Sequence, residues 1–165
     1  MPPQRASDTP VTDVTQELDD LVHQLVALHG EGGVCPTAED WRAILRGQAD
    51  APVTVLNLLK FTSVVQTPEG ASSGASAYRR YSAMVSAAFA RVGGKLIYFG
   101  KVGHGFAFAA PSPLVEGWDA AILTRYPSPR ALAAFWLDPE FVAAHAHRID
   151  GVERSQAFVL SSMQP

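Results

Sequence analysis

The stretch from Gly117 to Leu160 constrains the fold of this chain more than any other part, because it has the pattern of a complete strand–helix–strand unit. Residues 118–126 are rich in branched and aromatic side chains, and Pro127 ends the run, which is typical of a strand. Residues 152–160 have the same character and predict the last strand. The segment between the two strands has helical spacing, so we expect it to connect them across one face of a sheet.

Two helix starts lie inside this unit. Ser128 followed by Pro129 is a favourable N-cap and first helical residue, and Asp138-Pro139-Glu140 repeats the same signature. We therefore expect one helix directly after Ser128 and a second, short helix over 141–148 that ends near Gly151.

The middle of the chain supplies the remaining strands and a long helix. The segment VTVLNLLKF, residues 53–61, is apolar on both faces, which indicates a central strand covered on both sides. Apolar residues spaced by three and four predict an amphipathic helix over 75–92, and KLIYFGK, residues 95–101, predicts the next strand. We interpret the polar, glycine-containing residues 63–76 as a loop that is either disordered or a lid.

The N-terminal part has a different character. Residues 1–15 contain three prolines and few large apolar groups, so we expect them to be mobile. Leucine and valine at helical spacing predict a helix over 17–29, and Thr37 with Asp40 resembles a capping box that begins a second short helix. We assign residues 1–50 to a flexible N-terminus and helical extension, and residues 51–165 to the domain that holds the strands.

From residue 53 onward the predicted elements follow a βαββαβ order. This order indicates an α+β, ferredoxin-like fold, in which a four-stranded antiparallel sheet carries both helices on one face. Because the strands are apolar on both sides, the other face also needs a cover. The pattern favours a homodimer in which two such sheets stack as a dimeric α/β barrel, and the alternative is that the N-terminal helices cover this face.

Composition limits the kinds of partner and the cellular compartment that we expect for this chain. With 165 residues, 47% of them hydrophobic, the chain is long enough for one domain with a sizeable core. A net charge of -3 gives no electrostatic reason to expect nucleic acid or an anionic membrane as a partner. Cys35 is the only cysteine, no apolar run approaches the roughly 18 residues of a membrane-spanning helix, and no signal peptide is evident. We therefore expect a cytoplasmic protein.

Four segments carry a resemblance to a known family: VTVLNLLKF, YRRYSAMV, VGGKLIYFGK and WDAAILTRYPSPRALAAFWLDPEF. Their most specific pieces are the asparagine of NLLKF, the tyrosines of YRRY, the double glycine, and YPS followed by DPEF. Over residues 52–160 the chain resembles the proteins grouped as domain of unknown function 1330, within the dimeric α/β barrel superfamily. The resemblance implies the fold and a homodimer around a barrel-like cavity, and it implies no particular reaction.

Three residues are candidates for catalysis. His104 comes first, because an imidazole between two glycines is accessible and exchanges protons near neutral pH, although an ordinary exposed hairpin would have the same pattern. Asn57 is an amide among large hydrophobic residues, where it would either orient a substrate or satisfy a backbone group or a tyrosine. Tyr98 is a second candidate for orienting a substrate.

Four further residues are candidates for substrate binding. Arg79 or Arg125, together with Tyr98, would bind a carboxylate through the planar guanidinium, although exposure to solvent is the commoner fate of an arginine. Tyr81 lies on the apolar stripe of the central helix, and Trp118 begins the third strand.

We predict neither a metal site nor a cofactor. His145 and His147 lie two residues apart on a predicted helix and therefore point in different directions, so they cannot chelate one ion. No glycine-rich phosphate loop follows a predicted strand.

Two classes of function remain open. The first is a cofactor-independent enzyme acting on a small apolar or aromatic substrate, with His104 as the base and with Asn57 and Tyr98 as orienting residues. The second is a non-catalytic homodimer that binds a hydrophobic metabolite or a protein partner. Catalysis requires that His104, Asn57 and a tyrosine converge on one cavity.

Overall fold

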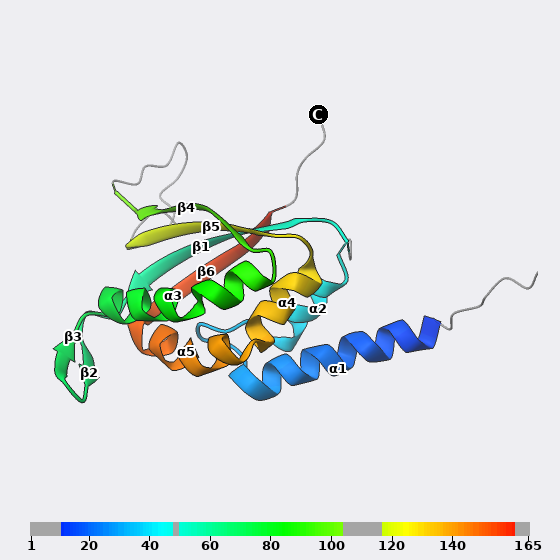
Figure 1. Cartoon of the computed structure of the whole chain (residues 1–165), viewed down its shortest axis with the longest axis horizontal. Coiled ribbons are helices and arrows are strands. Elements are labelled where there is room, and N and C mark those ends of the chain that lie inside the picture. The colour runs from blue at the N-terminus through cyan, green and yellow to red at the C-terminus, as the bar shows by residue number, and fades with distance from the viewer. Residues whose placement is uncertain (1–10, 48–49, 104–116, 161–165) are drawn as a thin grey trace, which may run out of the picture.

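A computed structural model of the chain describes residues 11–47, 50–103 and 117–160 (Figure 1). Its elements, in chain order, are α1 (Val11–His29), α2 (Ala38–Leu45), β1 (Val53–Phe61), β2 (Val65–Thr67), β3 (Gly70–Ser72), α3 (Gly74–Arg91), β4 (Lys95–Lys101), β5 (Ala120–Tyr126), α4 (Pro129–Leu137), α5 (Pro139–Gly151) and β6 (Val152–Leu160).

The four long strands form one antiparallel sheet in the order β4-β5-β1-β6. Strand β1 lies between β5 and β6, which confirms the central position predicted from its two apolar faces. The strands and the long helices α3 and α4–α5 follow the predicted βαββαβ order. The chain therefore has a ferredoxin-like α+β fold.

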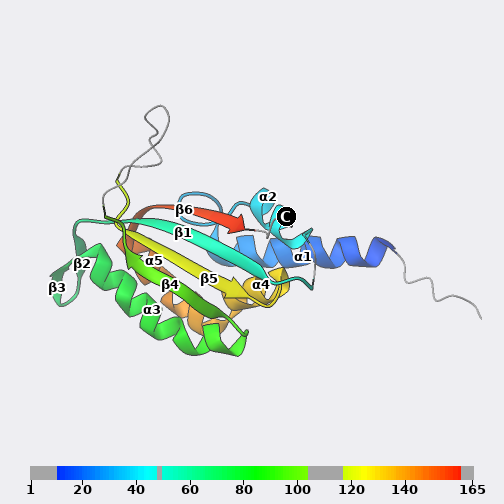
Figure 2. The same ribbon diagram turned by 90° about the horizontal axis from the view of Figure 1, so that it is seen from above.

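All five described helices lie on one face of this sheet (Figures 1 and 2). The N-terminal helices pack beside α4 on that face: Leu25 of α1 is fully buried, and Trp41 of α2 meets Trp136 of α4 with 5.3 Å between the ring centroids. The alternative in which the N-terminal helices cover the opposite face is therefore wrong. Their apolar stripes are buried against α4 instead.

The opposite face of the sheet is apolar at its centre, as predicted. The register of the strands places Leu56 directly across from Leu123 on one side and Phe158 on the other. Side chains of paired residues lie on the same face. The large hydrophobic residues of this face, here called the open face, are Leu56, Leu58, Tyr98, Leu123, Phe158 and Leu160.

Two local predictions need correction. Residues 63–76 include a short hairpin, β2–β3, where a loop was expected, because Gly70 adopts a φ of 119° and closes a tight turn after Thr67. Helix α1 begins at Val11, inside the segment expected to be mobile, because extending an existing helix by a turn costs far less than starting one.

The three helix starts predicted from capping residues are confirmed. Thr37 and Asp40 form a reciprocal capping box at the start of α2, and Ser128 and Asp138 are the N-caps of α4 and α5. None of the described helices is long and apolar enough to cross a membrane.

Candidate functional site

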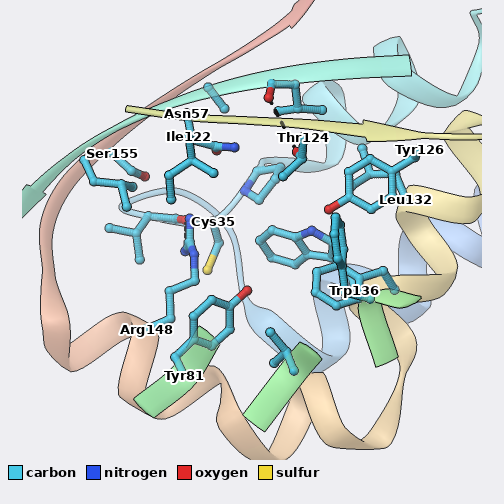
Figure 3. Close-up of a pocket in the computed structure, with 18 of the residues that line it drawn as sticks. Cys35, Asn57, Tyr81, Ile122, Thr124, Tyr126, Leu132, Trp136, Arg148 and Ser155 are labelled. Atoms are coloured by element: carbon cyan, nitrogen blue, oxygen red, sulfur yellow. Dashed lines mark hydrogen bonds between the residues drawn. The ribbon is translucent and has the colours of Figure 1, made fainter. Parts of the chain in front are cut away.

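A cavity of about 740 Å³ lies between the helix-covered face of the sheet and the helices (Figure 3). The sheet supplies one wall through β1, β4, β5 and β6, and α3 supplies the opposite wall. The N-terminal extension closes one side with residues 33–36 and with α2. The extension assigned to residues 1–50 is thus part of the site.

The lining is mainly apolar and aromatic. Its aromatic members are Trp41, Tyr78, Tyr81, Phe89, Phe99, Tyr126, Phe135 and Trp136. Several of these rings also pack on one another edge to face, which fixes their orientation around the open space. Such a lining favours an apolar or aromatic ligand with few polar groups.

Asn57 is placed in this cavity by the alternation of β1. Its side chain lies on the same face as those of Val55 and Leu59, between Ile122 and Ala157 of the neighbouring strands. Across the residues that the structure describes, the Asn57 amide makes no hydrogen bond to protein. The amide is therefore available to a ligand.

Tyr81 reaches the same cavity from α3, and Figure 3 shows its hydroxyl directed toward the open space. Burial raises the pKa of this phenol, so it stays protonated at neutral pH. Tyr81 lies on the wall opposite Asn57, and from there it can donate a hydrogen bond to a ligand in the cavity.

Among the lining residues that the structure describes, Arg148 of α5 is the only cation. Its side chain is 7% exposed, its Nη1 donates a hydrogen bond to the Val34 carbonyl at 2.7 Å, and its guanidinium lies 5.6 Å from the centre of the Trp136 ring. Arg148 was not among the site residues predicted from the sequence. The sequence did contain a signal for burial, because helical spacing places Arg148 on the same face as Phe141, Ala144 and His145.

Beside the cavity a chain of hydrogen bonds joins two histidines and the cysteine. His29 Nε2 lies 2.8 Å from the Trp136 carbonyl oxygen, His29 Nδ1 lies 2.8 Å from His145 Nδ1, and His145 Nε2 lies 3.8 Å from Cys35 Sγ. The carbonyl can only accept, so His29 Nε2 carries a proton. In the neutral pair His145 Nδ1 then donates to His29, which leaves the Nε2 lone pair of His145 facing the thiol.

Burial keeps these groups neutral. Desolvation, strengthened by the nearby Arg148 charge, lowers the pKa of His145 to about 4, and desolvation also lowers the pKa of His29. Burial raises the pKa of the Cys35 thiol, so the thiolate is disfavoured. Among the described residues there is no group of three or more His, Cys, Asp or Glu side chains arranged to hold a metal ion.

Of the other predicted site residues, the four that the structure describes are not brought to this cavity. Tyr98 and Arg125 lie on the open face, because Tyr98 pairs with Leu123 and Arg125 pairs with Thr54. Neither residue can therefore share a ligand with Asn57 inside the cavity of the same chain. A bulge in β4 between Leu96 and Tyr98 changes which of its residues share a face, and the sequence does not reveal it.

Two more predicted residues, Arg79 and Trp118, lie elsewhere, and a third is not described. Arg79 is exposed on α3 and donates to Ser76 Oγ at 2.9 Å. Trp118 lies under the Arg154 guanidinium, 4.5 Å from ring centre to cation, just before β5. His104 falls outside the described residues.

Comparison with known proteins supports the fold and assigns no activity. No family model matches the chain, so the resemblance to domain of unknown function 1330 stays a prediction, and no curated protein matches it. The chain is similar to a crystal structure of a protein of unknown function from Rhodopseudomonas palustris, with 29% identity and a TM-score of 0.67. That similarity covers 82% of this chain and 100% of the other.

Two solved structures are more distantly similar. One is SnoaB, a cofactor-independent oxygenase from Streptomyces nogalater, with 13% identity and a TM-score of 0.45 over 70% of this chain and 96% of that one. The other is a dimeric protein of unknown function with a ferredoxin-like fold from Bacteroides fragilis, with 15% identity and a TM-score of 0.43 over 69% of this chain and 99% of that one.

Proposed function

We propose that this protein is a homodimer that binds a small apolar or aromatic molecule in the cavity between the sheet and the helices. The observation that carries the proposal is the cavity itself, about 740 Å³ in volume and lined mostly by aromatic and aliphatic side chains. Ligand sites in proteins typically measure about 300–1,000 Å³ and combine an apolar lining with a few convergent polar groups. Asn57 and Tyr81 are such groups, on opposite walls.

Ligand binding in the cavity is tested by isothermal titration calorimetry with a neutral aromatic probe, naphthylacetamide. Val85 is a buried lining residue of α3, and the change Val85→Phe should fill part of the space and weaken binding by about fivefold or more, since excluding a ligand group from its pocket costs about 1 kcal/mol or more. The matched control is Val14→Phe, at a position on α1 that is 55% exposed, which should bind like the wild type. Unchanged affinity of folded Val85→Phe would show that the probe binds elsewhere.

The homodimer is supported by the open face. Its central leucines and the rings of Tyr98 and Phe158 form a contiguous apolar surface that no described helix covers. The same surface on a second copy is a complementary cover, because a two-fold axis brings identical patches together.

The dimer is tested by size-exclusion chromatography with light scattering. Leu56→Glu places a charge at the centre of the open face and should yield a folded monomer. Leu28→Glu makes the same change on α1, where Leu28 is 51% exposed, and should leave the dimer intact. A wild-type chain that is monomeric at micromolar concentration would refute the dimer.

A cofactor-independent acid/base enzyme is the second candidate. It is favoured by the Asn57 amide and the Tyr81 hydroxyl, which face one cavity and are suited to orient a substrate carbonyl. His104 would be its base. Any ligand found by titration is incubated with the protein and followed by mass spectrometry: the enzyme hypothesis expects conversion that His104→Gln abolishes while binding persists, and a ligand recovered unchanged from the wild type supports the binding protein.

A further inference from the structure

We propose that Arg148 makes the cavity selective for an acid, so that the ligand is an aromatic or aliphatic monocarboxylate whose carboxylate pairs with the Arg148 guanidinium. This inference rests on the proposed function, because it names the chemical class of the molecule that the cavity binds.

Arg148 is a buried cation with no counter-ion. Its side chain is 7% exposed, and none of the ion pairs formed by the described residues includes it. Arginine stays charged in proteins, so this positive charge cannot be removed by losing a proton. A buried charge without a partner is costly, and a bound anion would relieve that cost.

The unused donors of Arg148 border the cavity. A guanidinium has about five N–H groups, and the structure gives Arg148 one hydrogen bond, from Nη1 to the Val34 carbonyl. Every fully enclosed side-chain nitrogen or oxygen in the described part of the chain has a hydrogen-bond partner. The remaining Arg148 nitrogens therefore touch open space, and that space is the cavity that Arg148 lines.

No described group neighbouring Arg148 forms an ion pair with it. Asp40 is the only carboxylate among the described lining residues, and its Oδ2 accepts hydrogen bonds from the Thr37 amide and hydroxyl at 2.8 and 2.7 Å. The histidines beside Arg148 are held neutral by burial, and the Cys35 thiol is protonated. Among the described residues, Arg148 thus places a positive charge without an ion-pair partner in a largely apolar wall.

The position of Arg148 also sets how the ligand lies. Figure 3 shows its side chain rising from α5 toward the sheet, between Cys35 and Ser155 and next to Tyr81. A carboxylate there would accept two parallel hydrogen bonds from the guanidinium, with the Tyr81 hydroxyl as a further donor. The apolar body would then extend along Trp136 and Leu132, which line the cavity on the side of α4.

The experiment compares two probes of the same shape, naphthylacetate and naphthylacetamide, by isothermal titration calorimetry at neutral pH. The wild type should bind the acid roughly tenfold to a hundredfold more tightly than the amide, as expected for hydrogen bonds to a charged group. Arg148→Met should abolish this preference while binding of the amide persists, and Arg148→Lys, which keeps the charge but loses the planar fork, should retain a reduced preference. Arg79→Met is the control, since Arg79 is an exposed arginine outside the cavity.

The outcomes separate the inference from the function on which it rests. Equal affinity of the wild type for acid and amide would overturn the role of Arg148 and leave the binding cavity standing. A preference for the acid that survives Arg148→Met, or that is lost in Arg79→Met, would also overturn it. Failure of the wild type to bind either probe would count against both proposals. The wild-type ratio requires no variant, so the test holds even if Arg148→Met does not fold.

Discussion

At the scale of single residues, the hydrogen-bonded pair His29–His145 ties stability to pH. The pKa of His145 is lowered from 6.5 to about 4 in the folded chain, and the pKa of His29 is lowered as well. Below pH 6.5 the unfolded chain takes up protons that the folded chain does not, so acid favours unfolding. The stability linked to these groups is complete above about pH 6.5 and is lost as the pH falls toward about 4.

We therefore expect the urea midpoint of unfolding to fall between pH 7 and pH 5, and His145→Asn to reduce the slope of this fall. The control is His147→Asn, the same change two residues along α5, at a half-exposed side chain outside the hydrogen-bonded chain. The assignment of this pH dependence to His145 fails if the urea midpoint of His145→Asn falls with pH as steeply as that of the wild type.

Single residues also show what could and could not be predicted from the sequence. Asn57 was singled out as an amide that would either orient a substrate or satisfy a backbone group or a tyrosine. It lines the cavity because strand alternation sets its face. Tyr98 was selected with Asn57, yet the bulge in β4 and the register with β5 place it on the open face. Arg148 was passed over because the last turn of a helix is an ordinary place for an arginine, and only the packing around α5 makes it buried.

At the scale of elements, the junction of β1, α3 and α5 depends on two glycines. The Gly74 amide donates to the Thr62 carbonyl at 2.9 Å, and the Thr62 amide donates to the Gly151 carbonyl at 3.0 Å. A Cβ atom on Gly74 would lie 2.4 Å from the Gly151 carbonyl oxygen and 2.5 Å from that of Thr62, so backbone would have to move.

Gly74→Ala should therefore destabilise the fold by roughly 1–3 kcal/mol, the range of overpacking in a close-packed core. Gly103→Ala is the control, because a Cβ there meets nothing within 4 Å. Chemical denaturation followed by circular dichroism measures both. A Gly74→Ala chain as stable as the wild type would mean that the three elements do not approach this closely.

The elements themselves were largely predictable. Helix starts carry local signals, so Thr37, Ser128 and Asp138 could be identified as caps without knowledge of the fold. The hairpin β2–β3 was missed because two strands of three residues have too few side chains to show alternation.

At the scale of the whole molecule, the order of elements fixed the ferredoxin-like sheet, but the place of the N-terminal helices did not follow from it. Their apolar stripes needed a cover, and so did the open face. Which surface they would pair with depends on the fit between α2 and α4, above all on Trp41 against Trp136, and that fit is a property of packing.

One consequence is that residues 1–50 and 51–165 should not unfold separately. Val22, Leu25 and Trp41 belong to the same buried cluster as the core of the sheet and α4. Trp41 is 2% exposed, so Trp41→Ala should cost about 3–5 kcal/mol, and it should lower a single transition seen alike by far-UV circular dichroism and by tryptophan fluorescence. Arg42→Ala, which removes only an exposed ion pair with Asp19, should cost less than about 1 kcal/mol.

Two separated transitions in the wild type, or a Trp41→Ala change confined to one of them, would show that the extension is an independent unit.

A single transition also bears on function, because Trp41 is both a core residue and part of the cavity wall. A ligand that binds only the folded state then stabilises extension and sheet together, so saturating naphthylacetate should raise the one unfolding midpoint for both probes of structure.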